Sequence, residues 1–538
     1  MKLSGLFKVS LVAAAMTLAG CGGDIEITPT VNDNSTSTDN SVNNSNNSSG
    51  GGTSTEVECT SYETDAGTVE GIFDGLDCLY NDSFASKNIQ ITANLTFNEL
   101  PGGGVHVFDD ALLFGLDGDT SQGFEIPQNG PTLTVKPGAK LAFKSGDAII
   151  RVARGAKIQA IGTFEKPIVF TSAKAFERLD AEGNGPLYAD WGGIIINGKG
   201  ITNGCTDAER DAATCNRPSE GITSYYGGND NSDSSGNIKF AKIWYAGSGP
   251  KVGGEGDDLN SLTLNAVGSG SLFEYIHVHQ GYDDGVELFG GAANLKRIIV
   301  TDSQDDSFDF DSGWQGNAQF LYAMHGTVTL PDGTVVHMGN GGFEADGIKG
   351  EATEQAPTSN PTIANVTVIT TDGLSVRDND PSIAFKFDDS FTANYYNVLM
   401  TKDVATQTSC INFSSDGERQ ADKIIFNSAV MSCASEFAGE DSFVSGSEPD
   451  SLTATTKAAW FERGGINQRI GEGADVFAEN GFATNTASTD ITIDANDLST
   501  LDSDFFESAP YIGAVSDQDT DSTWYKWVET AVNAARAD

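Results

Sequence analysis

The chain has 538 residues, of which 76 are Asp or Glu and 31 are Lys or Arg, so its formal net charge is −45. This charge excludes nucleic acid and anionic membrane surfaces as partners, because both require basic patches. The 62 glycines are typical of a turn-dense β protein, and after the N-terminus no run of 18 apolar residues is available to span a membrane.

Residues 1–20 are predicted to be a lipoprotein signal peptide. Lys2 and Lys8 accompany an apolar run that ends in Leu-Ala-Gly-Cys, which resembles the lipobox of bacterial lipoproteins. The resemblance implies cleavage before Cys21 and acylation of that cysteine, for example by palmitate; the alternative is a plain secretory signal with an incidental cysteine. Because Gly22 and not Asp follows, we expect a lipid anchor in the outer membrane, with the protein at the cell surface.

The segment that follows the anchor is predicted to be a stalk. Residues 21–57 are rich in Ser, Asn, Thr and Gly and cannot bury enough apolar surface to fold. We expect an N-terminal cap over residues 58–131, because the first apolar coil of a solenoid needs a cover.

Residues 132–440 are predicted to form the solenoid. Val135–Leu141 (VKPGAKL) recurs 17 residues later as Val152–Ile158 (VARGAKI), and short apolar strands ended by glycine continue along the chain. Phe240–Gly247 (FAKIWYAG) aligns with Phe273–Gln280 (FEYIHVHQ). Runs this short, with alternating apolar residues, indicate strands rather than helices.

The clearest repeat lies between Gly268 and Trp314, where the sequence matches itself after a shift of 22 residues. The shift places Phe273 on Leu295, Ile276 on Ile298, Val278 on Val300 and Gly291 on Gly313. A strand-turn-strand unit of this length cannot bury its own apolar face and must stack on its neighbours. We therefore predict an all-β fold, a right-handed parallel β-helix of roughly a dozen coils.

The same shift superposes acidic residues. Asp283 falls on Asp305, Asp284 on Asp306, and Glu287 on Asp309. Coils about 4.8 Å apart would bring these carboxylates together, at a cost of roughly 3 to 4 kcal/mol per pair at an effective dielectric of 20. Water on an exposed turn, backbone N–H groups or a cation must offset this repulsion. Clustered carboxylates favour Ca²⁺, and the predicted ligands are Asp283, Asp284, Glu287, Asp305, Asp306, Asp309 and Asp311.

Apart from Cys21, the chain has six cysteines, which fall as neighbours in the sequence. Fifteen pairings are formally possible. Three local loops are the simplest arrangement, and an oxidising compartment allows them. The predicted disulfides are Cys59–Cys78, Cys205–Cys215 and Cys410–Cys433.

Residues 441–538 are predicted to form a C-terminal cap region that contains helices. Leu452–Arg463 and Ser522–Arg536 have helical apolar spacing, and the second places Trp524 and Trp527 on one face.

Taken together, the motifs resemble one family. They are VKPGAKL, WGGIIING, YAG, LNAVGSGSLFEYIHVHQGYDDGVELFGG, DDSFDFDSGW, PTIANVTVI and the late YIGAVSD with its two tryptophans, and they cover residues 59–530. The chain resembles a widespread group of acidic β-helix lipoproteins on Gram-negative surfaces, including spirochaete outer-membrane lipoproteins. It is also similar in character to the S-layer proteins of marine gammaproteobacteria. The family has no agreed catalytic residues, so the resemblance implies none here.

Three functions are compatible with these features. The first is a calcium-stabilised, non-enzymatic surface protein that associates with itself into a coat, and this is our prediction. The second is a polysaccharide-cleaving enzyme, which would use Asp305, Asp306, Asp309 and Asp311 with help from His277 and His279. Acids that recur at the repeat period are more typical of structural turns. The third is a module that binds surface polysaccharide or serves an outer-membrane receptor, with stacking platforms at Trp191, Trp244, Tyr245, Tyr282 and Trp314. Aromatic residues of this kind in β-helices more often fill the core or stack as ladders.

Overall fold

The chain divides into two units, residues 1–56 and 57–538. In this computed structural model the described residues are 57–249, 258–348, 356–377, 379–402, 409–414, 418, 420–433, 435–439, 443, 456–471, 476, 488–501 and 504–537. The predicted signal peptide, Cys21 and all but the last residue of the stalk lie outside the described residues.

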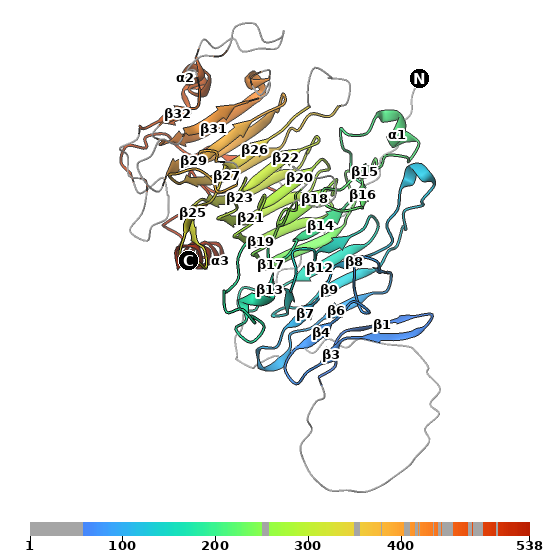
Figure 1. The fold of residues 1–538 in the computed structure, drawn as a ribbon. Helices are drawn as coiled ribbons and strands as arrows, with labels where there is room; N and C mark the ends of the chain where they lie inside the picture. The colour runs from blue at the N-terminus through green and yellow to red at the C-terminus, as the bar shows by residue number, and fades with distance from the viewer. Residues whose placement is uncertain are drawn as a thin grey trace, which may run out of the picture. The chain divides into compact units, whose positions relative to one another are not determined.

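The second unit is a parallel β-helix, in which most strands belong to two sheets (Figure 1). One sheet takes a single strand from each coil, which gives eleven coils among the described residues and agrees with the predicted dozen. Its strands are β5 (Gln90–Ile91), β8 (Leu112–Phe114), β11 (Ile150–Val152), β14 (Ile194–Asn197), β18 (Leu262–Asn265), β20 (Val286–Phe289), β22 (Phe308–Asp311), β26 (Gly341–Ala345), β28 (Ile383–Phe387), β30 (Ser409–Phe413) and β32 (Ser435–Phe437). The handedness of the coil stays a prediction.

The other sheet has sixteen described strands and bends into two faces. Residues 236–239 of its long strand β17 pair with β12, whereas residues 241–243 pair with β13. Each coil from β17 onward therefore crosses a corner within one strand. The strands are β3 (Ile72–Phe73), β4 (Cys78–Tyr80), β6 (Leu95–Phe97), β7 (His106–Phe108), β9 (Thr132–Val135), β10 (Lys140–Phe143), β12 (Lys157–Ile161), β13 (Ile168–Ser172), β17 (Gly236–Trp244), β19 (Leu272–His279), β21 (Asn294–Thr301), β23 (Asn317–Met324), β27 (Thr362–Thr370), β29 (Ala393–Lys402), β31 (Ile424–Met431) and β33 (Gln468–Arg469).

A left-handed residue makes the corner in each of these long strands. The φ angle is 50° at Phe240, 53° at Tyr275 and 61° at Arg297, and the series continues at Phe320, Asn365, Asn397 and Ser428. This conformation is costly for a residue with a Cβ. Contacts along the corner offset part of the cost, since the Phe240 and Tyr275 rings stack at 4.2 Å and the Arg297 guanidinium lies 5.1 Å from the Tyr275 ring.

The 22-residue repeat is confirmed by the strand register. Phe273 pairs with Leu295 and Ile276 with Ile298 in the sixteen-stranded sheet, and Glu287 pairs with Asp309 in the eleven-stranded sheet.

Two other sequence alignments are wrong. Val135 pairs with Ala160 and not with Val152, because VKPGAKL joins β9 to β10 whereas VARGAKI joins β11 to β12 at a different corner. In the second alignment Ile243 pairs with Val278, a slip of two residues. A slip of two keeps every side chain on its own face, so apolar alternation cannot detect it.

Parallel stacking begins before Thr132, within the segment expected to be a cap. β4 already pairs in parallel with β7, and β6 with β9. Among the described residues, a short hairpin of β1 (Ser61–Thr64) and β2 (Gly67–Glu70) precedes these strands outside the two sheets.

The core runs along the inside of the coils, where aromatic rings stack in register. Phe143 lies 5.2 Å from Phe108 and 4.6 Å from Trp191, and Phe343 lies between two further phenylalanines at 4.9 and 4.7 Å. Trp191 and Trp314, both proposed as ligand platforms, are fully buried. They therefore fill the core.

All three predicted disulfides are present: Cys59–Cys78, Cys205–Cys215 and Cys410–Cys433. The second lies in an insertion that carries the short helix α1 (Asp207–Asp211) and the strand pair β15 (Arg217–Pro218) and β16 (Tyr225–Tyr226). A second hairpin, β24 (Thr327–Thr329) and β25 (Val335–His337), projects from a later coil.

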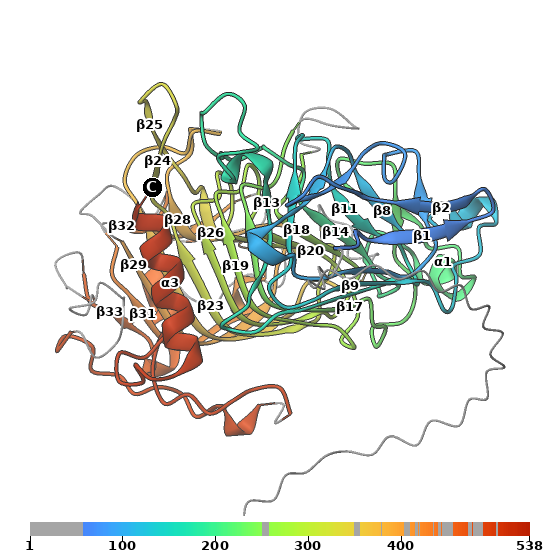
Figure 2. The same ribbon diagram turned by 90° about the horizontal axis from the view of Figure 1, so that it is seen from below.

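The C-terminal region contributes in two ways. Trp460 of α2 (Lys457–Phe461) joins the inner core, whereas α3 (Thr523–Ala537) packs its apolar face on the outside of the long strands (Figure 2). Trp527 of α3 lies 5.7 Å from the Phe240 ring at the corner. The expected helix at 522–536 is thus confirmed. In the described part of the chain, no helix combines the length and the apolar character needed to cross a bilayer.

A buried histidine links coils and provides a test of the fold. His325 Nε2 lies 3.1 Å from Ser307 Oγ, and its Nδ1 lies 2.6 Å from Ser382 Oγ. Burial lowers the pKa of His325 from 6.5 to about 4. The folded state therefore binds fewer protons than the unfolded chain, and the stability held by the neutral ring is lost as the pH falls from 6.5 towards 4, by about 3 kcal/mol.

We expect His325→Gln to flatten the fall in stability across this pH range, as measured by urea unfolding at several pH values. The half-exposed His337 serves as the control, and His337→Gln should leave the wild-type pH dependence intact. Equal slopes for wild type and His325→Gln would contradict the assignment.

Candidate metal site

A column of charged residues, three acidic and one basic, runs along the outward side of the eleven-stranded sheet. Glu287, Asp309, Glu344 and Lys386 are successive partners in the register of β20, β22, β26 and β28. Their strand neighbours, such as Val286 and Phe308, point inward into the core. The alternation of a β-strand thus places the charged residues on one outer line.

The turn before these strands carries a second acidic line. The Asp284 N–H donates to Asn260 Oδ1 at 3.1 Å, and the Asp306 N–H donates to Asp284 Oδ1 at 3.0 Å. The side chains of Asn260 and Asp284 therefore each accept a hydrogen bond from a backbone N–H group of the next coil. Backbone donors therefore offset part of the charge, as anticipated from the sequence.

Arg377 supplies a cation to the upstream end of the turn. Asp283, Asp284 and Asp305 offer carboxylate oxygens that all lie within 4.8 Å of one another. The Arg377 guanidinium lies 3.0 Å from Asp283, 3.0 Å from Asp305 and 2.7 Å from Asp258. One guanidinium therefore joins carboxylates from three coils, in a geometry suited to its forked donors.

Lys386 supplies a second cation, which pairs with carboxylates at the downstream end of the two acidic lines. Its Nζ lies 3.3 Å from Asp306 and 2.9 Å from Glu344. Burial alone would lower the pKa of Lys386, but these two carboxylates outweigh it and raise the pKa well above its usual value. Lys386 is therefore held charged.

Between these two cations lies a second cluster, formed by Asp284, Glu287 and Asp309. Their carboxylate oxygens also lie within 4.8 Å of one another. Asn260 Nδ2 donates to Glu287 Oε2, while Asp309 Oδ1 is buried and has no hydrogen-bond partner. Burial, and then the neighbouring carboxylates, raise the pKa of all three groups well above their usual values.

The second cluster fits a hard divalent cation. Ca²⁺ takes oxygen ligands at about 2.3 to 2.6 Å, so oxygens around one ion are separated by up to about 5 Å. The donors here are carboxylate oxygens, without imidazole or thiolate, which favours Ca²⁺ or Mg²⁺ over Zn²⁺. Asp284, Glu287 and Asp309 would hold the ion.

The structure brings six of the seven predicted ligands into this network. Asp311 belongs to neither of the two clusters, and Asp306 is occupied by Lys386. His277 and His279, considered as catalytic helpers, instead contact Thr301 Oγ1 at 3.0 and 2.8 Å from the other sheet.

Sequence reasoning missed several members of the network. Arg377 lies outside the repeat. The segment Gly341–Gly350 echoes the acidic turn in the sequence, but its Glu344 and Asp346, which form a further cluster with Asp388, were not predicted as ligands. Asn260 could have been found, since it occupies the position of Asp284 one coil earlier.

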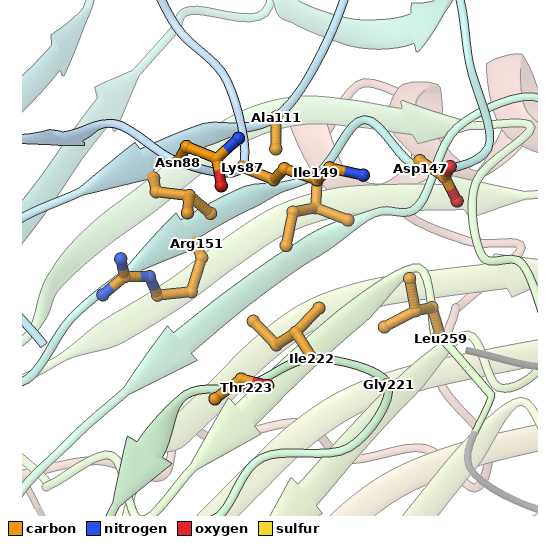
Figure 3. A pocket seen from close by; sticks show the side chains of 11 residues that line it. Lys87, Asn88, Ala111, Asp147, Ile149, Arg151, Gly221, Ile222, Thr223 and Leu259 are labelled. Carbon is orange, nitrogen blue, oxygen red and sulfur yellow. The ribbon is translucent and has the colours of Figure 1, made fainter. Parts of the chain in front are cut away.

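A groove of about 490 Å³ lies upstream on the outward side of the same sheet (Figure 3). Its walls are mainly aliphatic, with Lys87, Asn88, Asp147 and Thr223 as polar members. Arg151 also lines it, and its guanidinium lies 3.7 Å from Asp117. The lining lacks an aromatic ring, and sugar rings stack best on aromatic faces.

The fold and the charged outer face define an acidic parallel β-helix protein. A family model described as a pectate-lyase like beta helix domain matches residues 118–459, more than half of the chain. The chain belongs to this family. No curated protein and no solved structure matches the sequence.

Removing the Arg377 guanidinium should leave two buried carboxylates, Asp258 and Asp283, and the partly buried Asp305 without their shared cation. We expect Arg377→Met to lower the free energy of unfolding by about 3 to 5 kcal/mol at neutral pH, measured by chemical denaturation. Arg469 offers a matched control, since it also pairs with two carboxylates but in a more exposed setting. Arg469→Met should cost about 1 kcal/mol or less, and a loss at Arg377→Met as small as that at Arg469→Met would contradict the role of the Arg377 network.

Proposed function

We propose that this protein is a non-enzymatic surface lipoprotein, anchored in the outer membrane through Cys21, whose β-helix is stabilised by calcium and forms a coat or S-layer-like array. The lipobox, the stalk composition and the resemblance to acidic β-helix lipoproteins support the location. The net charge of −45 supports an environment rich in divalent cations, because like-charged molecules can then pack side by side.

One observation carries the calcium role. The cluster of Asp284, Glu287 and Asp309 is largely buried near Arg377 and Lys386, yet none of its three carboxyl groups forms an ion pair with a described residue. Protonation or a bound ion must relieve their repulsion. At neutral pH in calcium-rich water, Ca²⁺ is the simpler solution.

Calcium should therefore stabilise the purified full chain, and a chelator should lower its Tm. At a calcium concentration about 100 times Kd the gain would be about 2.7 kcal/mol. Asp309→Asn should raise Tm in chelator, because it removes one repelling charge, and should weaken the response to calcium.

Asp82→Asn is the control for this experiment, since it removes the same charge at an exposed position just after β4, several coils upstream of the cluster. Differential scanning calorimetry with and without calcium would compare the three proteins. If chelation changes nothing, or if both variants respond as the wild type does, the calcium role is wrong.

A polysaccharide-related function is the second candidate, favoured by membership of the pectate-lyase like family. Against catalysis, Asp305 is paired with Arg377 and Asp306 with Lys386, and the two histidines bond elsewhere. Incubation of the full chain with uronate polymers and neutral glycans should release no products on chromatography. Cleavage abolished by Asp305→Asn would replace the structural proposal with an enzymatic one.

A further inference from the structure

Positive charge is concentrated in the upstream coils. Residues 132–178 contain nine Lys or Arg against three Asp or Glu, in a chain whose total charge is −45. Some of these cations are internally paired, as Lys144 is with Asp109 and Lys166 is with Glu99. Others remain exposed on the outside of the sixteen-stranded sheet.

We call the outward surface of β9 and β12 the basic patch. Lys157 and Gln159 lie beside Thr132 and Thr134 in the strand register, and Lys136 directly follows β9. Lys136 and Lys157 are exposed and form no ion pair with any described residue. Ile161, at the end of the same outward row, is 39% exposed. The patch is thus a flat sheet surface of mixed cationic, amide and apolar character.

Farther along the same sheet, an acidic part of the chain covers the corresponding surface. Residues 488–521, the acidic segment, contain nine Asp or Glu and no Lys or Arg. Glu507 accepts from Lys296 at 3.2 Å, and its backbone carbonyl accepts from Gln319 at 2.8 Å. Asn397 donates to the Asn496 carbonyl at 3.2 Å. Within one molecule, lysine and amide side chains on the outside of this sheet therefore already bind the acidic segment.

The outer side of the acidic segment remains available. Asp490 and Asp494 of this segment are exposed. Two surfaces of opposite charge thus occur on different parts of the same molecule, and the lysines of the basic patch are exposed among the described residues.

We propose that the acidic segment of one molecule docks on the basic patch of a second copy, which makes the lateral contact of the coat. The inference rests on the proposed coat function and names its contact surfaces. Because the two surfaces differ, the contact is heterologous and can propagate into an open array. Charge complementarity also explains how chains of net charge −45 approach one another in one orientation.

Charge reversal on each side tests this contact with the full chain. Lys136→Glu with Lys157→Glu, and separately Asp490→Lys with Asp494→Lys, should each weaken self-association by at least about tenfold in Kd, measured by sedimentation velocity. An equal mixture of the two double variants should associate again, because the reversed surfaces complement each other. The wild-type association should weaken as salt is raised.

The control is Lys87→Glu with Lys423→Glu, which changes the net charge equally at exposed lysines elsewhere and should leave association unchanged. A monomeric wild type, a mixture that fails to associate, or an equal effect of the control would overturn the proposal. Binding to phosphatidylglycerol vesicles that is lost with Lys136→Glu and Lys157→Glu would also overturn it, by assigning the patch to a lipid surface. An unchanged Tm on chelation would contradict the calcium role in the proposed function and would not bear on the contact between copies.

Discussion

Parallel stacking in register is the constraint on which the rest of this structure depends. When one coil lies directly over the next, a residue is repeated above its equivalent at about one strand spacing. The repetition is favourable for Phe308, Phe343 and Phe385, whose rings stack in the core. It is unfavourable for Glu287 and Asp309, whose carboxylates are brought together by the same geometry. Core and site are therefore two results of one arrangement.

The cations that answer this repulsion come from distant parts of the chain. Arg377 reaches back to carboxylates as far as Asp258, and Lys386 reaches Asp306 from two coils later. Each therefore ties together coils that are not neighbours in sequence, so the acidic line also fixes their relative positions. The carboxylates of Asp284, Glu287 and Asp309 are the ones whose repulsion an ion from solution would offset.

The sequence predicts the pairing of strands correctly where no insertion interrupts the repeat. The 22-residue shift predicts the pairing of Phe273 with Leu295 and of Glu287 with Asp309, because no insertion separates those coils. The alignment of Val135 with Val152 is wrong because the two motifs turn different corners. The alignment of Phe240 with Phe273 is wrong because a slip of two residues keeps every side chain on its own face. Arg377 could not be found in this way, since it lies in a loop whose path back to the turn depends on the tertiary structure. The burial of Trp191 and Trp314 agrees with the expectation that aromatic residues of a β-helix more often fill its core than serve as ligand platforms.

The position of α3 has a consequence for the order in which parts of the protein fold. Ile299, Tyr322, Ile369 and Leu399 form an apolar strip on the outside of the coils, and residues of α3 and the segment before it cover that strip. These covering residues follow the described strands of the coils in the sequence and are therefore synthesised after them. The coils can stack as they are synthesised, whereas the apolar strip on their outside stays exposed to water until α3 and the segment before it pack on it. Any chaperone acting on this protein would then have one defined surface to shield, and its release would coincide with the docking of α3.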